Sequence, residues 1–180
     1  MESATEMFAT RPRDSISVRA LAAAAGTATA AVYTLFGSKD GLIDEVRSRA
    51  AAGLFQELSA VPTSAEPLAD LYALAVAYRR WGRNHRHLYA VLFGGAQSFE
   101  PSGPVGAADP VRPLLEAIAR AQSASALAGD PTAIALSLWV TLHGLVVLEL
   151  AGALPPVTAE QTFESAIHAT LRGWATPITH

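Results

Sequence analysis

The sequence predicts an all-α protein with two parts, an N-terminal three-helix domain that contains a helix-turn-helix and a C-terminal helical bundle. Three observations support this prediction. Apolar residues recur at spacings of three and four along most of the chain, which is the spacing of one helix face. Gly and Pro separate these segments, as they do at helix ends. Finally, 180 residues are enough for a small domain packed on a larger one, and the absence of cysteine means that the core is held without disulfides.

The helix-turn-helix is expected within residues 16–42. A first short helix is predicted from Val18 because apolar residues follow it at i+3, i+4 and i+7. Gly26 then supplies a backbone conformation of positive φ, which ends that helix. A second short helix is expected from near residues 27–29 to residue 35, and Gly37 ends it. Two helices joined by a short turn with Gly form the geometry that places the second helix in a DNA major groove.

Two further helices are predicted beside this motif. Residues 2–9 can form a short opening helix, with Phe8 facing the hairpin. Ser38 is expected to cap a longer helix that runs to about residue 59 and leads out of the DNA-facing part. We divide the chain into a helix-turn-helix DNA-binding domain at 1–49 and a helical domain at 50–180, to which the family resemblance given below assigns ligand binding and dimerisation.

The second domain is predicted to contain five helices, at residues 67–84, 85–94, 111–128, 132–154 and 158–174. Thr158, with Gln161 three residues later, has the spacing of a capping box and predicts the start of the last helix. Residues 94–110 are rich in Gly, Pro, Ser and Ala, and we expect a mobile loop there.

Residues 132–154 are the most apolar part of the chain and are long enough to cross a membrane. However, polar residues interrupt this stretch, and the acidic Asp130 and Glu149 flank it where basic anchors are expected. A helix that is apolar all round is otherwise a buried one. We therefore expect no membrane contact. The predicted dimer core consists of Leu136, Val140, Val147 and Leu150 with Phe163, Ile167, Leu171 and Trp174.

The overall composition also favours a partner subunit. Hydrophobic residues make up 51% of the chain, and the mean hydropathy is +0.26. The first ten residues contain neither a basic start nor an apolar run, so we expect no secretory signal and a cytoplasmic protein. The net charge is −3, which predicts weak non-specific affinity for DNA.

Two groups of residues resemble the tetracycline-repressor (TetR) family. The N-terminal group consists of Ser17-Val18-Arg19, Leu21-Ala22, Ala25-Gly26, Val32-Tyr33, Phe36 and Ser38-Lys39-Asp40-Gly41-Leu42. The second group resembles the ligand-binding domain of a TetR subgroup named for a Trp-His-Gly motif. It consists of His85–Gly95, Trp139, His143-Gly144-Leu145 and Leu148-Glu149-Leu150-Ala151-Gly152. The resemblance implies a homodimeric regulator that binds double-stranded operator DNA and responds to a small-molecule effector.

The resemblance also implies phosphate contacts from Ser17, Tyr33 and Lys39. Lys39 lies at a helix N-terminus, where free N–H groups already attract a phosphate. The recognition helix contains no Arg, Lys, Asn or Gln, so bidentate readout of guanine or adenine is absent, and we expect readout to depend on thymine methyl groups and DNA shape. The predicted DNA-binding residues are Ser17, Arg19, Thr27, Thr29, Tyr33, Thr34 and Lys39.

The effector site is predicted from aromatic residues on the helices that surround the pocket in the resembling family. These residues are Tyr78, Trp81, Tyr89, Phe93, Trp139 and His143. Because none of them is acidic, we expect a neutral or anionic aromatic or acyl compound. The alternative is that these side chains pack tightly as core and leave no cavity.

Other functions are weighed against this one. A non-DNA-binding dimeric small-molecule-binding module on the same fold is the main alternative, because the recognition helix carries so few base-reading groups. An enzyme that uses His143 with Glu149 is a further alternative, although the sequence has no recognised enzyme motif, and we expect neither a metal nor a cofactor. Arg79, Arg80, Arg83 and Arg86 form a basic run, which we interpret as a solvated face or a supporting contact to DNA.

Overall fold

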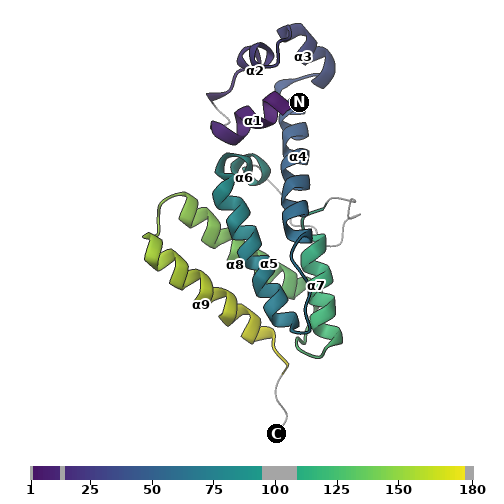
Figure 1. The fold of residues 1–180 in the computed structure, drawn as a ribbon, viewed down its shortest axis with the longest axis vertical. Coiled ribbons are helices and arrows are strands. Elements are labelled where there is room, and N and C mark those ends of the chain that lie inside the picture. The colour runs from purple at the N-terminus through teal and green to yellow at the C-terminus, as the bar shows by residue number, and fades with distance from the viewer. Residues whose placement is uncertain (1, 13–14, 95–108, 177–180) are drawn as a thin grey trace. The chain divides into compact units, whose positions relative to one another are not determined.

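The computed structural model describes residues 2–12, 15–94 and 109–176, and its regular elements there are all helices (Figure 1). The all-α prediction is confirmed. The chain forms two compact units. One unit comprises residues 1–53 with 84–98, and the other comprises residues 54–83 with 99–180. Each unit therefore contains two separate segments of the chain.

The first unit contains the N-terminal helices together with one helix from further along the chain. Its helices are α1 (Glu2–Thr10), α2 (Val18–Ala24), α3 (Thr29–Phe36), the first part of α4 (Lys39–Ser59) and α6 (Arg86–Phe93). Within this unit α1 packs against α2 and α6, and α2 packs against α3. Phe8 on α1 is fully buried, as expected.

Local hydrogen bonds explain where the helices of the motif begin and end. The Ser17 hydroxyl accepts a hydrogen bond from the Ala20 amide at 3.1 Å and caps α2, and the Ser38 hydroxyl accepts one from the Gly41 amide at 3.0 Å and caps α4. Gly26 and Gly37 have φ values of 63° and 71°, as expected for residues that end a helix.

Helix α3 begins without such a cap. Its N-cap residue is Ala28, which offers no side-chain acceptor to the first free amides, and Thr27 does not take over that role. The stability of α3 therefore depends on the packing of its buried residue, Val32.

The second unit contains the end of α4 with α5 (Pro67–Asn84), α7 (Arg112–Ser123), α8 (Pro131–Leu150) and α9 (Pro156–Trp174). Helix α8 packs against both α7 and α9. The bounds of α5 agree with the prediction, whereas α7 ends five residues early, where Ser125 adopts a φ of 55°. Most of the predicted loop at 94–110 lies outside the described residues.

The predicted capping box at Thr158 is wrong. Helix α9 begins two residues earlier, at Pro156, with Pro155 as its N-cap residue and no side-chain cap. Proline suits the first helical position because its φ is already helical and its missing N–H would have had no partner there. Thr158 thus lies inside the first turn.

Helix α8 is apolar enough for a membrane span, with a mean hydropathy of 1.9, yet only 28% of that window is buried in the described structure. The buried side faces α7 and α9. Leu136, Val140 and Val147 of the same helix are exposed. The predicted dimer core is wrong for three residues of α9, because Phe163, Ile167 and Leu171 are buried within their own subunit.

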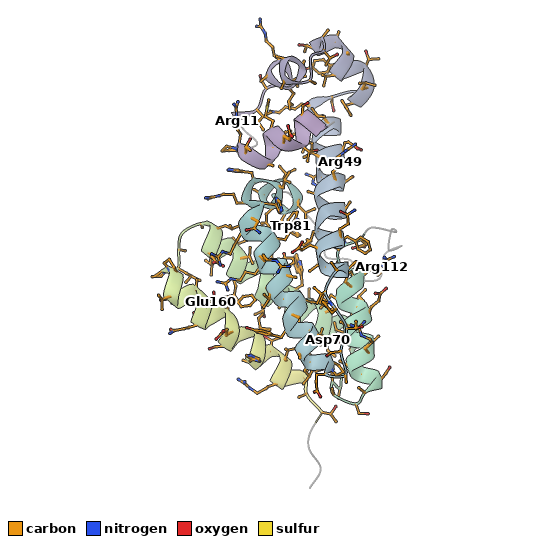
Figure 2. The ribbon with its side chains drawn as sticks, viewed as in Figure 1. Arg11, Arg49, Asp70, Trp81, Arg112 and Glu160 are labelled. Carbon is orange, nitrogen blue, oxygen red and sulfur yellow. The ribbon has the colours of Figure 1, made fainter. Side chains whose placement is uncertain are left out.

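The interpretation of the basic run as a solvated face is wrong for Arg79. This residue of α5 is only 6% exposed. Its guanidinium donates to both Glu149 carboxylate oxygens, at 2.8 and 3.1 Å, and to Glu160 at 2.8 Å, and it lies 4.6 Å from the centre of the Phe163 ring. Figure 2 labels Glu160 on α9. Arg79 therefore joins α5 to the end of α8 and the start of α9.

Arg79→Ala should destabilise the protein by about 3 kcal/mol, because removing one partner of a buried ion pair leaves the other charge uncompensated. Arg80→Ala is the matched control. Arg80 is the next residue and is exposed, and its ion pair with Glu57 should contribute about 0–1 kcal/mol. Urea denaturation measures both values. Equal losses for the two variants would contradict the structural role of Arg79.

Candidate functional site

The seven predicted DNA-binding residues all lie in the first unit, on or next to α2, α3 and the start of α4. Ser17, Arg19, Thr27, Tyr33 and Thr34 are exposed, whereas Thr29 and Lys39 are partly buried. Lys39 is the first residue of α4, directly after the capping Ser38. Lys39 therefore adds a positive charge at a helix N-terminus, where backbone N–H groups and the helix dipole already favour binding of a phosphate.

The outer side of α3 carries few hydrogen-bonding groups. The Thr34 hydroxyl donates to the Ala30 carbonyl of its own helix at 2.9 Å. Tyr33, which is 49% exposed, retains an accessible phenol. Sequence reasoning missed Leu35, which is 73% exposed and is not part of the predicted set. The periodicity gave no signal for this, since Leu35 follows the buried Val32 at i+3, a spacing that places two residues on the same face of a helix.

The six predicted effector-site residues separate into two groups. Tyr78 and Trp81 on α5, with Trp139 and His143 on α8, lie in the second unit, whereas Tyr89 and Phe93 on α6 lie in the first. The two α6 rings are in contact, with centroids 4.7 Å apart. In the second unit the Tyr78 hydroxyl lies 3.4 Å from His143 Nδ1, and the Trp139 and His143 rings stack 5.1 Å apart.

Burial determines the chemistry of the His143 ring. Desolvation lowers the pKa of His143 below its ordinary value of 6.5. The ring is therefore neutral at pH 7, with one nitrogen that donates and one that accepts a hydrogen bond. Such a group among aromatic side chains can orient a ligand in an apolar site. The Glu149 carboxylate, which the enzyme alternative pairs with His143, is held by Arg79 and Arg83.

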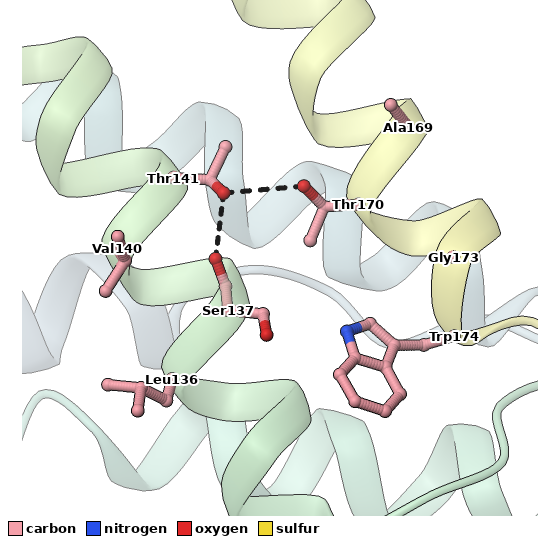
Figure 3. A pocket seen from close by; sticks show the side chains of 8 residues that line it. All are labelled: Leu136, Ser137, Val140, Thr141, Ala169, Thr170, Gly173 and Trp174. Carbon is pink, nitrogen blue, oxygen red and sulfur yellow. Dashed lines mark hydrogen bonds between the residues drawn. The ribbon is translucent and has the colours of Figure 1, made fainter.

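An open groove of about 570 Å³ lies between α8 and α9 (Figure 3). Its walls consist of Leu136, Ser137, Val140, Thr141, Ala169, Thr170, Gly173 and Trp174. The Thr141 and Thr170 hydroxyls face each other across it at 3.4 Å. Small side chains on α9 leave this groove shallow, and the exposed apolar residues of α8 border it.

A second hollow of about 270 Å³ lies between the end of α4, α5 and α7, near Asp70 and Arg112, which Figure 2 labels. Asp70 accepts hydrogen bonds from the Ser64 amide and hydroxyl, and these bonds lower the pKa of its carboxyl group. Asp70 thus fixes the loop before α5. None of the six predicted effector-site residues lines this hollow or the α8–α9 groove.

Comparison with known proteins identifies relatives along nearly the whole chain. The family model "Bacterial regulatory proteins, tetR family" matches residues 1–46, and "Tetracyclin repressor-like, C-terminal domain" matches residues 71–170. An uncharacterised HTH-type transcriptional regulator, Rv0681 of Mycobacterium tuberculosis, is 27% identical over 172 residues, which are 93% of this chain and 76% of that protein. Membership of the Trp-His-Gly subgroup stays a prediction.

Solved structures show the same fold. A protein with unknown function from a Rhodococcus species has a TM-score of 0.76 and 26% identity, with 96% of each chain covered. The TetR family transcriptional regulator PfmR from Thermus thermophilus has a TM-score of 0.67 and 21% identity, with 95% of this chain and 96% of that chain covered. Together with the two matching family models, these likenesses show that the chain belongs to the tetR family of bacterial regulatory proteins and is a transcriptional regulator.

Proposed function

We propose that this regulator is a homodimeric repressor that binds a two-fold symmetric operator and is released by a small apolar ligand. The exposed helix-turn-helix carries this proposal. Helix α3 buries only Val32 among its residues and leaves its other side free, and Lys39 follows at the start of α4. In a dimer, two copies of α3 enter successive major grooves about 34–36 Å apart.

The dimer is proposed to form over α8 and α9. Leu136, Val140, Val147 and Leu148 expose large apolar side chains on α8. On α9, Ala169 and Gly173 lie at the groove and permit close approach of a second helix. A two-fold axis would place the same patch of each subunit against itself, which is the usual geometry of a closed homodimer.

Release of the operator by the ligand requires two conformations of the dimer. One conformation spaces the two α3 helices for the operator, and the ligand binds the other more tightly. The group of Tyr78, Trp139 and His143 supports an apolar ligand site, because it combines aromatic surface with a neutral imidazole. The absence of an acidic member favours a neutral or anionic aromatic or acyl compound.

The alternative function is a dimeric small-molecule-binding module without DNA binding. The hydroxyl of Thr34, which is already bonded within α3, favours this alternative because it further reduces the groups that can read bases. Binding to the DNA upstream of the protein's own gene separates the two functions. Salt-dependent binding to this DNA supports the repressor, and the absence of binding supports the small-molecule-binding module.

Lys39→Ala should weaken binding to all DNA sequences alike. It should also reduce the magnitude of the negative slope of log K against log salt concentration by about 0.9, the value for one lost phosphate contact. Arg49→Ala is the matched control, since it removes one positive charge from an exposed site further along the same helix, where Arg49 pairs with Glu45. Fluorescence anisotropy at several salt concentrations measures both slopes. An unchanged slope for Lys39→Ala would refute the proposed phosphate contact.

Val140→Asp should yield a folded monomer, because Val140 is 55% exposed in the subunit and lies in the proposed interface. Ile167→Asp should instead unfold the subunit, since Ile167 is fully buried within it and would place a charge in the core. Val76→Asp, on an exposed position of α5, should remain dimeric. Light scattering and circular dichroism test the three variants. A dimeric Val140→Asp protein argues against this interface.

His143→Phe should retain operator binding but lose release by ligand, because it keeps the aromatic surface and removes the polar group that orients the ligand. His168→Phe is the control, since His168 is exposed on α9 and stacks against Tyr72. A panel of aromatic and acyl carboxylic acids, tested for displacement of labelled operator DNA, provides the measurement. Equal release of the wild type and His143→Phe would exclude His143 from the site.

A further inference from the structure

The outer side of α3 presents methyl and methylene groups where DNA-reading helices usually present amides and cations. Ala30, Tyr33, Thr34 and Leu35 are its exposed residues after the first position. Leu35 is 73% exposed, the highest value among the large hydrophobic side chains of the described residues. Folding of the subunit gains almost nothing from this side chain.

Thr34 and Leu35 are consecutive exposed residues near the end of α3. At about 100° per residue, Thr34 lies nearly opposite the buried Val32, whereas Leu35 lies about 60° from Val32 and about 100° from Thr34 and is nevertheless exposed. The Thr34 hydroxyl donates to the Ala30 carbonyl at 2.9 Å. Its hydrogen is therefore used within the helix, and the methyl group is the part of Thr34 that can contact a base. Thr34 and Leu35 thus each present apolar groups on the exposed surface of α3.

The major groove contains one apolar group that such a surface can recognise, the C5 methyl of thymine. All four bases present hydrogen-bonding atoms there, but only thymine adds a methyl group that Leu35 can cover without taking a polar atom out of water. Apolar contact therefore favours thymine over the other three bases.

We propose that Leu35, with the methyl group of Thr34, is a specificity-determining residue that reads the C5-methyl groups of thymines in each operator half-site. This inference rests on the proposed DNA-binding function. It adds a residue to the recognition surface and states which atom of the base that residue contacts.

The test uses DNA that differs only by the methyl group. A random double-stranded library is enriched on the full-length wild-type protein, and the enriched site is synthesised with deoxyuridine in place of one thymidine at a time. Deoxyuridine keeps the hydrogen-bonding edges and lacks the C5 methyl. At one or more thymidines in each half-site, the substitution should weaken binding about fourfold, the factor for removing one buried methyl group. 5-Bromodeoxyuridine at the same positions should restore binding.

Protein variants assign the effect to the side chains. Leu35→Ala should bind the thymidine site more weakly and should no longer distinguish thymidine from deoxyuridine at the positions that Leu35 contacts. Thr34→Val should keep the distinction, because it retains a methyl group. Val157→Ala changes an equally exposed apolar residue, 72% exposed on α9, and should bind both DNAs as the wild type does. Thermal melting checks that each variant is folded.

The outcomes separate this inference from the function on which it rests. If the wild type binds its enriched site but tolerates deoxyuridine at every position, the methyl readout is wrong while DNA binding stands. An equal loss of affinity for both DNAs in Leu35→Ala would also overturn it. If no sequence is enriched, the proposed DNA-binding function fails, and the inference fails with it.

Discussion

The apolar surface of α8 is the constraint on which the rest of the structure depends. This helix has a mean hydropathy of 1.9, yet one subunit can cover only the side that faces α7 and α9. Leu136, Val140 and Val147 remain about half exposed, and burying the rest of each would contribute about 0.7–1.5 kcal/mol. Arg79 links the end of α8 and the start of α9 to α5 through its ion pairs with Glu149 and Glu160.

The proposed dimer connects this constraint to DNA binding. Helix α3 is only eight residues long, begins without a side-chain cap, and presents mainly apolar groups. A single copy would thus make few base contacts, each of modest free energy. Two copies held by one interface contact two half-sites together, so their contributions combine within one binding event. In this proposal, apolar pairing through α8 compensates for the weak readout by each α3.

Local features were predictable from sequence, and long-range partners were not. Gly26, Gly37 and the Ser38 cap act within a few residues, so the helix-turn-helix could be placed correctly. Arg79 was misread as solvated because its partner Glu149 is 70 residues away in the chain. On α8 the residues assigned to the outer side, Leu136, Val140 and Val147, are exposed, although a helix that is apolar all round has little periodic signal. Helix α9 has a clear apolar face, but the sequence does not show whether that face packs on its own subunit or on a partner, so Ile167 was assigned to the dimer interface instead of the subunit core.

The stoichiometry of the wild-type protein on DNA tests the central claim most directly. Sedimentation velocity, with labelled operator DNA and protein from nanomolar to micromolar concentration, gives the mass of the free protein and of the complex. We expect a free dimer of the 18.8 kDa chain and two chains on each operator. A free monomer at micromolar concentration, with one chain on each DNA site, would contradict the proposal that pairing through α8 and α9 creates the DNA-binding unit.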